Sequence, residues 1–245
     1  MNKWGVALLV IGCNVLINQY AFAYPDSHPP FPADKPAPFP ALSADPILDY
    51  AEGRFEDGSL RISTSPERDK VGRVTTVEVN GYPVFDTASA HPDLYFQFGS
   101  RVFYTDLTGD GRKDILIYSS PGGNGLGASI EIADLLIAKP DGQFTHSTFE
   151  AFAAGPEDFL DVNGDGRYEM LWVNYYFEGD HSYWVYRIVE IGNDGLQLND
   201  QLIPDFPKII WFTEKPNDHP TQQLTAAARE DLIQQSTAKW QGVAQ

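Results

Sequence analysis

The sequence predicts a mainly β fold, in which antiparallel, propeller-like units of four strands form a partial or small propeller and one helix follows at the C-terminal end. Three observations lead to this prediction. Short runs rich in Val, Ile, Tyr and Phe extend from about Ile47 to Leu202 between turn signals. A nine-residue acidic loop occurs twice, 55 residues apart. Apolar residues at helical spacing occur only after the β region.

Residues 1–23 have the features of a secretory signal peptide. Lys3 gives the charged start, Trp4 to Ile17 the apolar run, and Ala21-Phe-Ala23 the small-residue cleavage site. We therefore expect an exported protein, periplasmic or secreted, whose mature chain begins at Tyr24. The alternative is a lipoprotein signal in Val10-Ile-Gly-Cys13, with an acylated Cys13 that anchors the protein to the envelope.

Composition restricts the partners and the stabilising chemistry. Cys13 is the only cysteine, so cleavage after Ala23 leaves neither a disulfide nor a thiolate metal site. With 17 Lys and Arg against 34 Asp and Glu, the formal charge is −17, which disfavours nucleic acid as a partner. No second apolar run reaches the roughly 18 residues that a membrane-spanning helix needs, so the mature chain is expected to have no transmembrane segment.

Residues 24–46 are rich in proline, which removes backbone donors and favours extended geometry. This segment is interpreted as a tether or as an arm that wraps the surface. A proline-rich ligand for another domain is the third reading.

The β repeat domain is expected over residues 47–215, in units at about 47–100, 101–156 and 157–203. Asn80-Gly81 and Asp141-Gly142 are typical of tight hairpin turns. The second and third units each contain an acidic loop between strands, and the first would be a degraded unit without that loop. The expected strands of these two units are 101–105, 114–119, 129–138, 143–149, 158–162, 169–177, 181–191 and 196–202.

The C-terminal segment, residues 220–241, is expected to form one amphipathic helix. Apolar groups recur at positions i, i+4 and i+8 between Leu224 and Trp240. Such a helix would cover a sheet edge or face that the β units leave open.

The two acidic loops begin at Asp106 and Asp161 and have oxygen-bearing side chains at positions one, three, five and nine around a glycine at position six. Calcium takes six to eight oxygen ligands, and such a loop, with a backbone carbonyl at position seven, can surround one ion. The EF-hand does not fit, because its twelfth position is a glutamate, whereas the twelfth positions here are Ile117 and Trp172, inside expected strands. The sequence thus predicts two calcium sites in a β setting.

The first loop, with Phe98-Gly99 before it and Asp114-Ile-Leu-Ile after it, resembles the FG-GAP or VCBS repeat family of integrin-type propellers and exported bacterial proteins. The second copy keeps the loop and the exit strand but has no Phe-Gly pair at the matching offset. Two departures concern the ligands, since Thr108 replaces the usual acid or amide at position three and Glu169 replaces the usual Asp at position nine. The resemblance implies that the ligands come from Asp106, Thr108, Asp110, the Arg112 carbonyl and Asp114 in the first loop, and from Asp161, Asn163, Asp165, the Arg167 carbonyl and Glu169 in the second.

The residues favour a binding or interaction module with mainly structural calcium and an unidentified protein or carbohydrate ligand. Five scattered histidines and the absence of known catalytic motifs give enzyme chemistry little support. The alternative is an enzyme that acts on polysaccharide or cell-wall material and uses calcium to hold an acidic sugar, with Asp180 and His181 as the acid–base groups to examine. A purely structural envelope component is the third possibility. Among the many aromatic residues, the best candidates for exposure are Tyr175, Tyr176 and Phe177.

Overall fold

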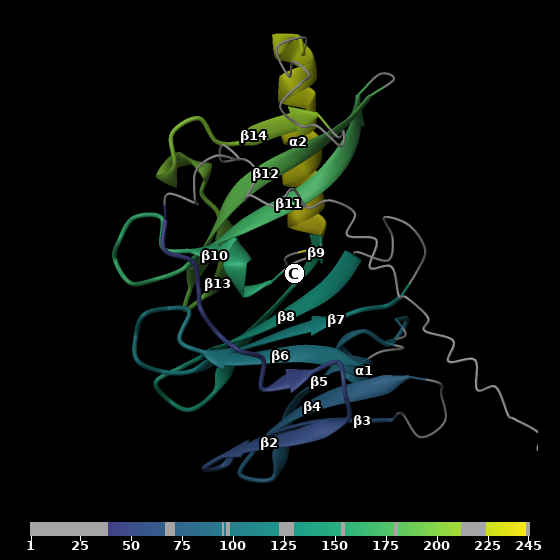
Figure 1. Cartoon of the computed structure of the whole chain (residues 1–245), viewed down its shortest axis with the longest axis vertical. Helices are drawn as coiled ribbons and strands as arrows, with labels where there is room; N and C mark the ends of the chain where they lie inside the picture. The colour runs from purple at the N-terminus through teal and green to yellow at the C-terminus, as the bar shows by residue number, and fades with distance from the viewer. Residues whose placement is uncertain are drawn as a thin grey trace, which may run out of the picture.

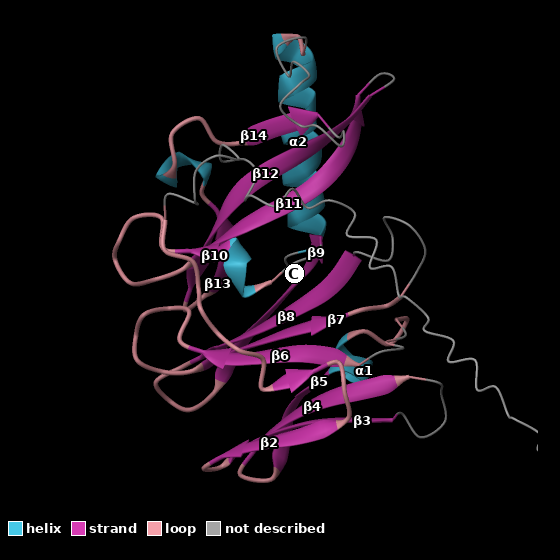
Figure 2. Cartoon of the chain, in the orientation of Figure 1, coloured by secondary structure: helices cyan, strands magenta, loops and turns pink. Residues whose placement is uncertain are grey.

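The computed structural model describes residues 39–66, 72–94, 96, 99–122, 130–152, 155–178, 181–211 and 224–243. Within them the chain forms three antiparallel sheets and a long helix near the C-terminal end (Figures 1 and 2). The mainly β prediction is therefore confirmed. The expected signal peptide, Cys13, Phe98 and the greater part of the proline-rich segment lie outside the described residues. None of the described helices combines the length and apolar character needed to cross a membrane.

The first sheet is an antiparallel meander whose strands follow one another in chain order. The predicted turn at Asn80-Gly81 is present, and both residues have positive φ, 53° and 79°, as the tight hairpin requires. A helix of four residues, which the sequence analysis did not predict, follows the sheet, and its Asp86 cap accepts a hydrogen bond from the Ser89 N–H at 2.7 Å. The elements are β2 (Gly53–Asp57), β3 (Leu60–Pro66), β4 (Arg73–Val79), β5 (Tyr82–Asp86) and α1 (Thr87–Ala90).

The second sheet contains each strand predicted for the unit 101–156, to within a few residues at the ends. Its order is β1-β6-β7-β8-β9. The predicted division into units 47–100 and 101–156 needs a correction. Leu48 of β1, which the prediction placed in the first unit, pairs with Val102 of β6 and so belongs to the second sheet. The strands are β1 (Leu48–Asp49), β6 (Ser100–Thr105), β7 (Asp114–Ser119), β8 (Ile130–Ala138) and β9 (Phe144–Phe152).

The third sheet has the order β10-β11-β12-β13, and β14 pairs with the part of β12 that β13 leaves open. The predicted strand 196–202 was too long, because the Asp200 carboxylate accepts the Ile188 N–H at 3.0 Å and takes the chain out of the ladder. The predicted strand 158–162 is reduced to two residues by a short 3₁₀ helix that begins at Pro156. The elements are η2 (Pro156–Asp158), β10 (Phe159–Leu160), β11 (Glu169–Glu178), β12 (His181–Gly192), β13 (Gly195–Leu198), η3 (Asp200–Leu202) and β14 (Lys208–Trp211).

The second sheet lies between the other two, as Figure 1 shows, and each of its faces forms part of a core. Strand alternation separates the two sets of side chains. Ile115 and Ile117 face the first sheet and pack in one cluster with Ile62, while Leu116 and Phe103 share a cluster with Trp172 of the third sheet. The three sheets are thus held together by apolar contact on both faces of the middle one.

The helix α2 (Ala226–Val243) packs against the third sheet and β9. Leu232, Ser236 and Trp240 are buried at a spacing of four residues, which is the face predicted from the sequence. The helix extends to Val243 instead of 241 and begins at Ala226, so the predicted start was too early. Leu224 and Thr225 are not helical, and the Thr225 hydroxyl accepts the Ala228 N–H at 3.1 Å, which marks the first turn. Residues 220–223 lie outside the described residues.

Residues 39–49 cross from the third sheet to the second. Ala41 forms a β-bridge with Leu160, and the Leu42 N–H donates to the Phe159 carbonyl at 2.8 Å. The chain then reaches β6, where the Ile47 N–H donates to the Val102 carbonyl at 2.8 Å. The described end of the proline-rich segment is therefore an arm that follows the surface of two sheets.

Candidate metal centre

The first acidic loop joins β6 to β7, and its side chains hold its own backbone. Asp106, at position one, accepts the N–H groups of Asp110 at 3.2 Å and Gly111 at 2.7 Å. Asp110, at position five, accepts the Arg112 N–H at 2.9 Å. Asp114, at position nine, reaches back to the Leu107 N–H at position two, at 2.9 Å. These bonds fold the loop into a closed turn.

The second acidic loop joins β10 to β11 and repeats this pattern position by position. Asp161 accepts the N–H groups of Asp165 at 3.1 Å and Gly166 at 3.1 Å, and Asp165 accepts the Arg167 N–H at 2.9 Å. Glu169 accepts the Val162 N–H at 3.1 Å, from position nine to position two. The glycines at positions four and six have positive φ in both loops, so the backbone as well as the side chains is the same. The sequence repeat is therefore also a structural repeat.

The two position-nine acids differ in how fully their oxygens are used. Asp114 is completely buried and accepts three backbone N–H groups, from Leu107, Thr108 and Ala138. Glu169 is 3% exposed but accepts only the Val162 N–H among the described residues. One oxygen of Glu169 thus stays available to a cation, whereas both oxygens of Asp114 already accept backbone hydrogen bonds.

Burial changes the ionisation of both acids. Desolvation raises the pKa of Asp114, and its backbone hydrogen bonds offset only part of that effect. Desolvation also raises the pKa of Glu169, and the negative charges of Asp165, Asp161 and Glu190 add to the increase, against one backbone hydrogen bond. Ionised Glu169 is therefore costly in this loop, and a nearby cation would relieve that cost.

The donor set consists of oxygens, which suits a hard cation such as calcium. At position three, Thr108 is 4% exposed and its hydroxyl has no hydrogen-bond partner among the described residues. An orphaned buried oxygen at a ligand position is consistent with a missing partner. No cluster of three or more His, Cys, Asp or Glu side chains with metal-binding geometry is found in the described part of the chain. The oxygens would thus have to converge further, by small movements within each loop, to surround an ion.

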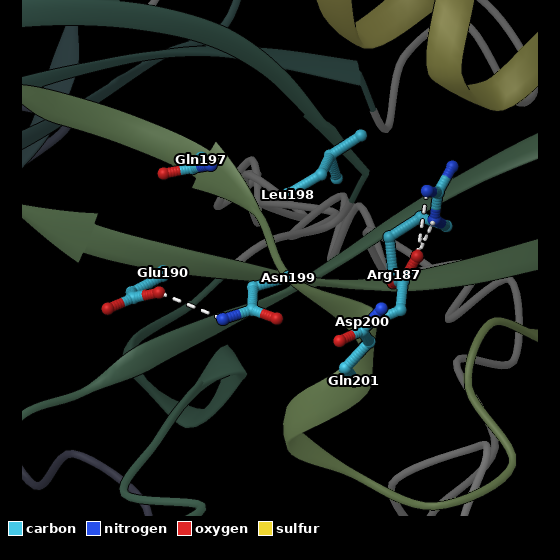
Figure 3. A pocket seen from close by; sticks show the side chains of 7 residues that line it. All are labelled: Arg187, Glu190, Gln197, Leu198, Asn199, Asp200 and Gln201. Carbon is cyan, nitrogen blue, oxygen red and sulfur yellow. Dashed lines mark hydrogen bonds and ion pairs between the residues drawn. The ribbon is translucent and has the colours of Figure 1, made fainter.

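A polar cleft of about 420 Å³ lies at the edge of the third sheet, near the second loop (Figure 3). Arg187, on its floor, is 5% exposed and donates to Asp200 at 2.7 Å. Glu190, on the rim, accepts from Asn199 at 3.0 Å, and its charge adds to burial and to the charges of Asp165 and Asp161 in raising the pKa of Glu169. The sequence analysis did not single out Glu190, although its register beside the second loop follows once β11 and β12 are paired. The cleft is lined by Arg187, Glu190, Gln197, Leu198, Asn199, Asp200 and Gln201.

His181, one of the two acid–base groups considered for an enzyme, lies far from the second loop. His181 pairs with Glu178 at the far end of the β11–β12 hairpin, whereas Glu169 begins β11 at the other end. Ten residues of strand separate the two ends by roughly 30 Å. Asp180 lies outside the described residues. His181 therefore gives no support to the enzyme alternative.

The expectation about exposed aromatic residues needs one correction. Phe177 is 65% exposed and Tyr175 is half-buried, but Tyr176 is only 8% exposed. Strand alternation explains the difference, because Tyr176 points to the face that the helix covers and its two neighbours point to the opposite face.

A buried carboxylate between the first and second sheets was not predicted. Asp134 is completely buried and is bonded to the ring nitrogens of His91 and His146 at 2.9 and 2.8 Å, and to the Thr148 hydroxyl at 2.8 Å. Burial alone would raise the pKa of Asp134, but the hydrogen bonds from His146, His91 and Thr148 outweigh it and hold the pKa below its usual value. The available signal was one acid inside the apolar run Ile132 to Ile137. The pairing partners could not be read from the sequence.

No model of a known protein family matches the chain, and the curated proteins compared with it include no match.

Proposed function

We propose that this chain is an exported calcium-binding β-repeat protein of the FG-GAP or VCBS type, in which calcium is mainly structural and the folded protein serves as a binding or interaction module. The observation that carries the proposal is the repeated loop. Two segments 55 residues apart share oxygen side chains at positions one, three, five and nine and the same side-chain to backbone hydrogen bonds. An ordinary surface turn has no reason to be copied at this level of detail.

A structural role for calcium follows from where the loops lie. Each loop connects two adjacent strands of one sheet and brings three carboxylates into nine residues. These charges repel one another, and a divalent cation converts the repulsion into a link between the strands, so that binding and folding are coupled. Most of the carboxylate oxygens in the loops accept N–H groups of the same loop, which favours a role in stability.

The propeller-like arrangement is part of the same proposal. Three successive antiparallel meanders, each largely continuous in sequence, are what support it. Export to the periplasm or beyond, with a lipid anchor at Cys13 as the alternative, is proposed from the composition of residues 1–23. The partner is proposed to be a protein or carbohydrate of the envelope, and affinity capture from the native envelope with and without chelator tests both the partner and its calcium dependence.

Calorimetric titration and thermal unfolding of the purified chain test calcium binding directly. One site at a hundred times its dissociation constant adds about 2.7 kcal/mol to the free energy of unfolding, and for a chain of this size that raises Tm by roughly 5–10 °C. The double variant Asp106→Asn with Asp161→Asn keeps one of the two acceptor oxygens of each side chain and should lose the calcium response. Asp141→Asn, in a turn outside the loops, should keep it. No binding heat and no rise in Tm in excess calcium would contradict the proposal.

A further inference from the structure

The two acidic loops lie against each other. They leave the second and third sheets on the same side of the molecule, at the left of Figure 1. The Tyr168 N–H, at position eight of the second loop, donates to the Leu107 carbonyl, at position two of the first loop, at 3.0 Å. Leu107 is completely buried in the core between these sheets, and Tyr168 packs against the same core. The backbone contact between the loops therefore lies beside two residues that pack in one core.

Gly109 lies directly against the second loop. A Cβ atom built on Gly109 would lie 2.6 Å from the Gly166 carbonyl oxygen and 3.2 Å from the Arg167 Cγ, so the first loop fits here only because glycine has no side chain. Gly164 occupies the same position in the second loop with a similar φ, 75° against 67°, and a Cβ atom there would meet nothing within 4 Å. The two loops thus offer a matched pair of glycines. A side chain at Gly109 would collide with the other loop, whereas a side chain at Gly164 would not.

Two hydrogen bonds and the backbone between them connect the two position-nine acids. Asp114 accepts the Leu107 N–H, and the carbonyl of Leu107 accepts the N–H of Tyr168. Tyr168 directly precedes Glu169, which in turn accepts the Val162 N–H. Displacement of either acid toward a cation therefore moves backbone that the other loop also contacts.

We infer that the two cation sites are coupled, so that calcium in one loop raises the affinity of the other. This inference rests on the proposed calcium binding. A cation that orders one loop also restricts the motion of the Leu107–Tyr168 contact. Less conformational entropy is then lost when the second loop becomes ordered around its own ion. Electrostatic repulsion between the two ions does not prevent this. The two loops contain six carboxylates and three basic side chains, Arg112, Lys113 and Arg167. A first calcium ion adds two positive charges, and the negative charges are still in excess. The second ion therefore also enters a negative region.

Calcium titration of the full chain, by calorimetry in chelator-treated buffer, tests the coupling. The wild type should bind two ions with a Hill coefficient above 1. Asp161→Asn, which weakens the second site, should lower the affinity of the first site by about five-fold or more, the lower end of ordinary coupling between sites. By reciprocity, Asp106→Asn should lower the affinity of the second site by the same factor.

The glycine pair shows whether the loop contact carries the coupling. In a Gly109→Ala background, Asp161→Asn should leave the first-site affinity nearly unchanged. In a Gly164→Ala background, which carries the same backbone strain without the steric contact, the five-fold effect should remain. Hydrogen exchange of the Tyr168 amide gives a readout without calcium, and it should become faster in Gly109→Ala than in Gly164→Ala.

Two sites that bind calcium independently in the wild type would overturn the inference and leave the proposed function intact. Equal behaviour of the two glycine variants would also overturn it, since the contact would then have no role. A chain that binds no calcium at all removes the proposed function itself, so the two failures are distinguishable. A variant that is unfolded by thermal scanning is replaced by Tyr168→Pro, which removes the donated N–H, with Tyr168→Phe, which keeps it, as the control.

Discussion

Trp240, near the C-terminal end of α2, packs edge-on against Trp172 of β11, with ring centroids 5.0 Å apart and ring planes at 68°. Both rings are almost completely buried, and the ring centroid of Phe149 of β9 lies 6.4 Å from that of Trp240. The Trp172 ring also donates its N–H to the Glu150 carbonyl at 2.8 Å. The helix is thus attached at the junction of the second and third sheets, where one aromatic side chain meets both.

Trp240→Ala should destabilise the protein by about 3–5 kcal/mol, since it removes a large buried ring and leaves a cavity. Urea unfolding measures the loss. The control is Gln234→Ala, an exposed position on the same helix, which should change stability by no more than about 0.5 kcal/mol. A loss below about 1 kcal/mol for Trp240→Ala would show that the helix is not a structural part of the fold.

Glu169→Gln should stabilise the protein in the presence of chelator at pH 7. A carboxyl whose folded pKa is raised stabilises the fold below its unfolded pKa and loses that contribution as pH rises through the folded pKa. At pH 7 the ionised Glu169 is therefore a cost, which the amide removes. The Tm difference from wild type should narrow as pH falls toward about 4.3, the unperturbed pKa of glutamate.

The same substitution should reduce the gain in Tm that calcium produces, because a ligand charge is lost. Glu178→Gln, at the other end of β11, is the control and should change neither quantity. Thermal scans with chelator and with excess calcium give both values. A Glu169→Gln protein that is less stable in chelator and keeps the full calcium response would refute this account of the second loop.

Asp134→Asn should weaken the attachment of the first sheet to the second. The carboxylate accepts bonds from His91, His146 and Thr148, and bonds to a charged group contribute about 1.5–3 kcal/mol. Because the folded pKa of Asp134 is lowered, its contribution is present above the unfolded pKa, near 3.9, and is lost as pH falls through the folded value. The difference in stability between wild type and variant should therefore begin to narrow as pH falls below about 4, and a difference that widens there would contradict the assignment.

Asp200→Ala should cost about 3–5 kcal/mol, because it leaves the Arg187 guanidinium buried without its carboxylate. Asp205→Asn is the control, since asparagine removes the charge and tolerates the positive φ of 66° at this residue. Its ion pair with Lys208 is exposed, and such pairs contribute about 0–1 kcal/mol. Denaturant unfolding of the two variants should differ clearly, and similar losses would mean that Arg187 finds another partner.

Local pattern was enough to predict most of the β structure, since alternation and turn residues act within a few positions. The strand from Asp114 to Ser119 and the turn at Asn80-Gly81 are examples. The elements that were missed or misplaced depend on distant groups. Leu198 ends its strand because Asp200 bonds to Ile188, and β1 joins the second sheet because it pairs with β6. No short stretch of sequence contains those partners.

The candidate site likewise has one part that the sequence predicts and another that depends on distant contacts. The ligand-type residues of each loop follow from spacing, because a cation loop is local. The contact between Leu107 and Tyr168 and the influence of Glu190 on Glu169 arise only when two sheets, or two paired strands, come together. Calcium binding itself remains a prediction for the titration to decide.

The surface arm formed by residues 39–49 has a consequence for the order of folding. Most strand pairs of the described chain join neighbours in sequence, and such short-range contacts form quickly. The arm is different, because Ala41 meets Leu160 and Leu48 meets Val102 only after a long stretch of chain has been closed into a loop. Although synthesised before all three sheets, this segment should reach its place only after the second and third sheets have formed.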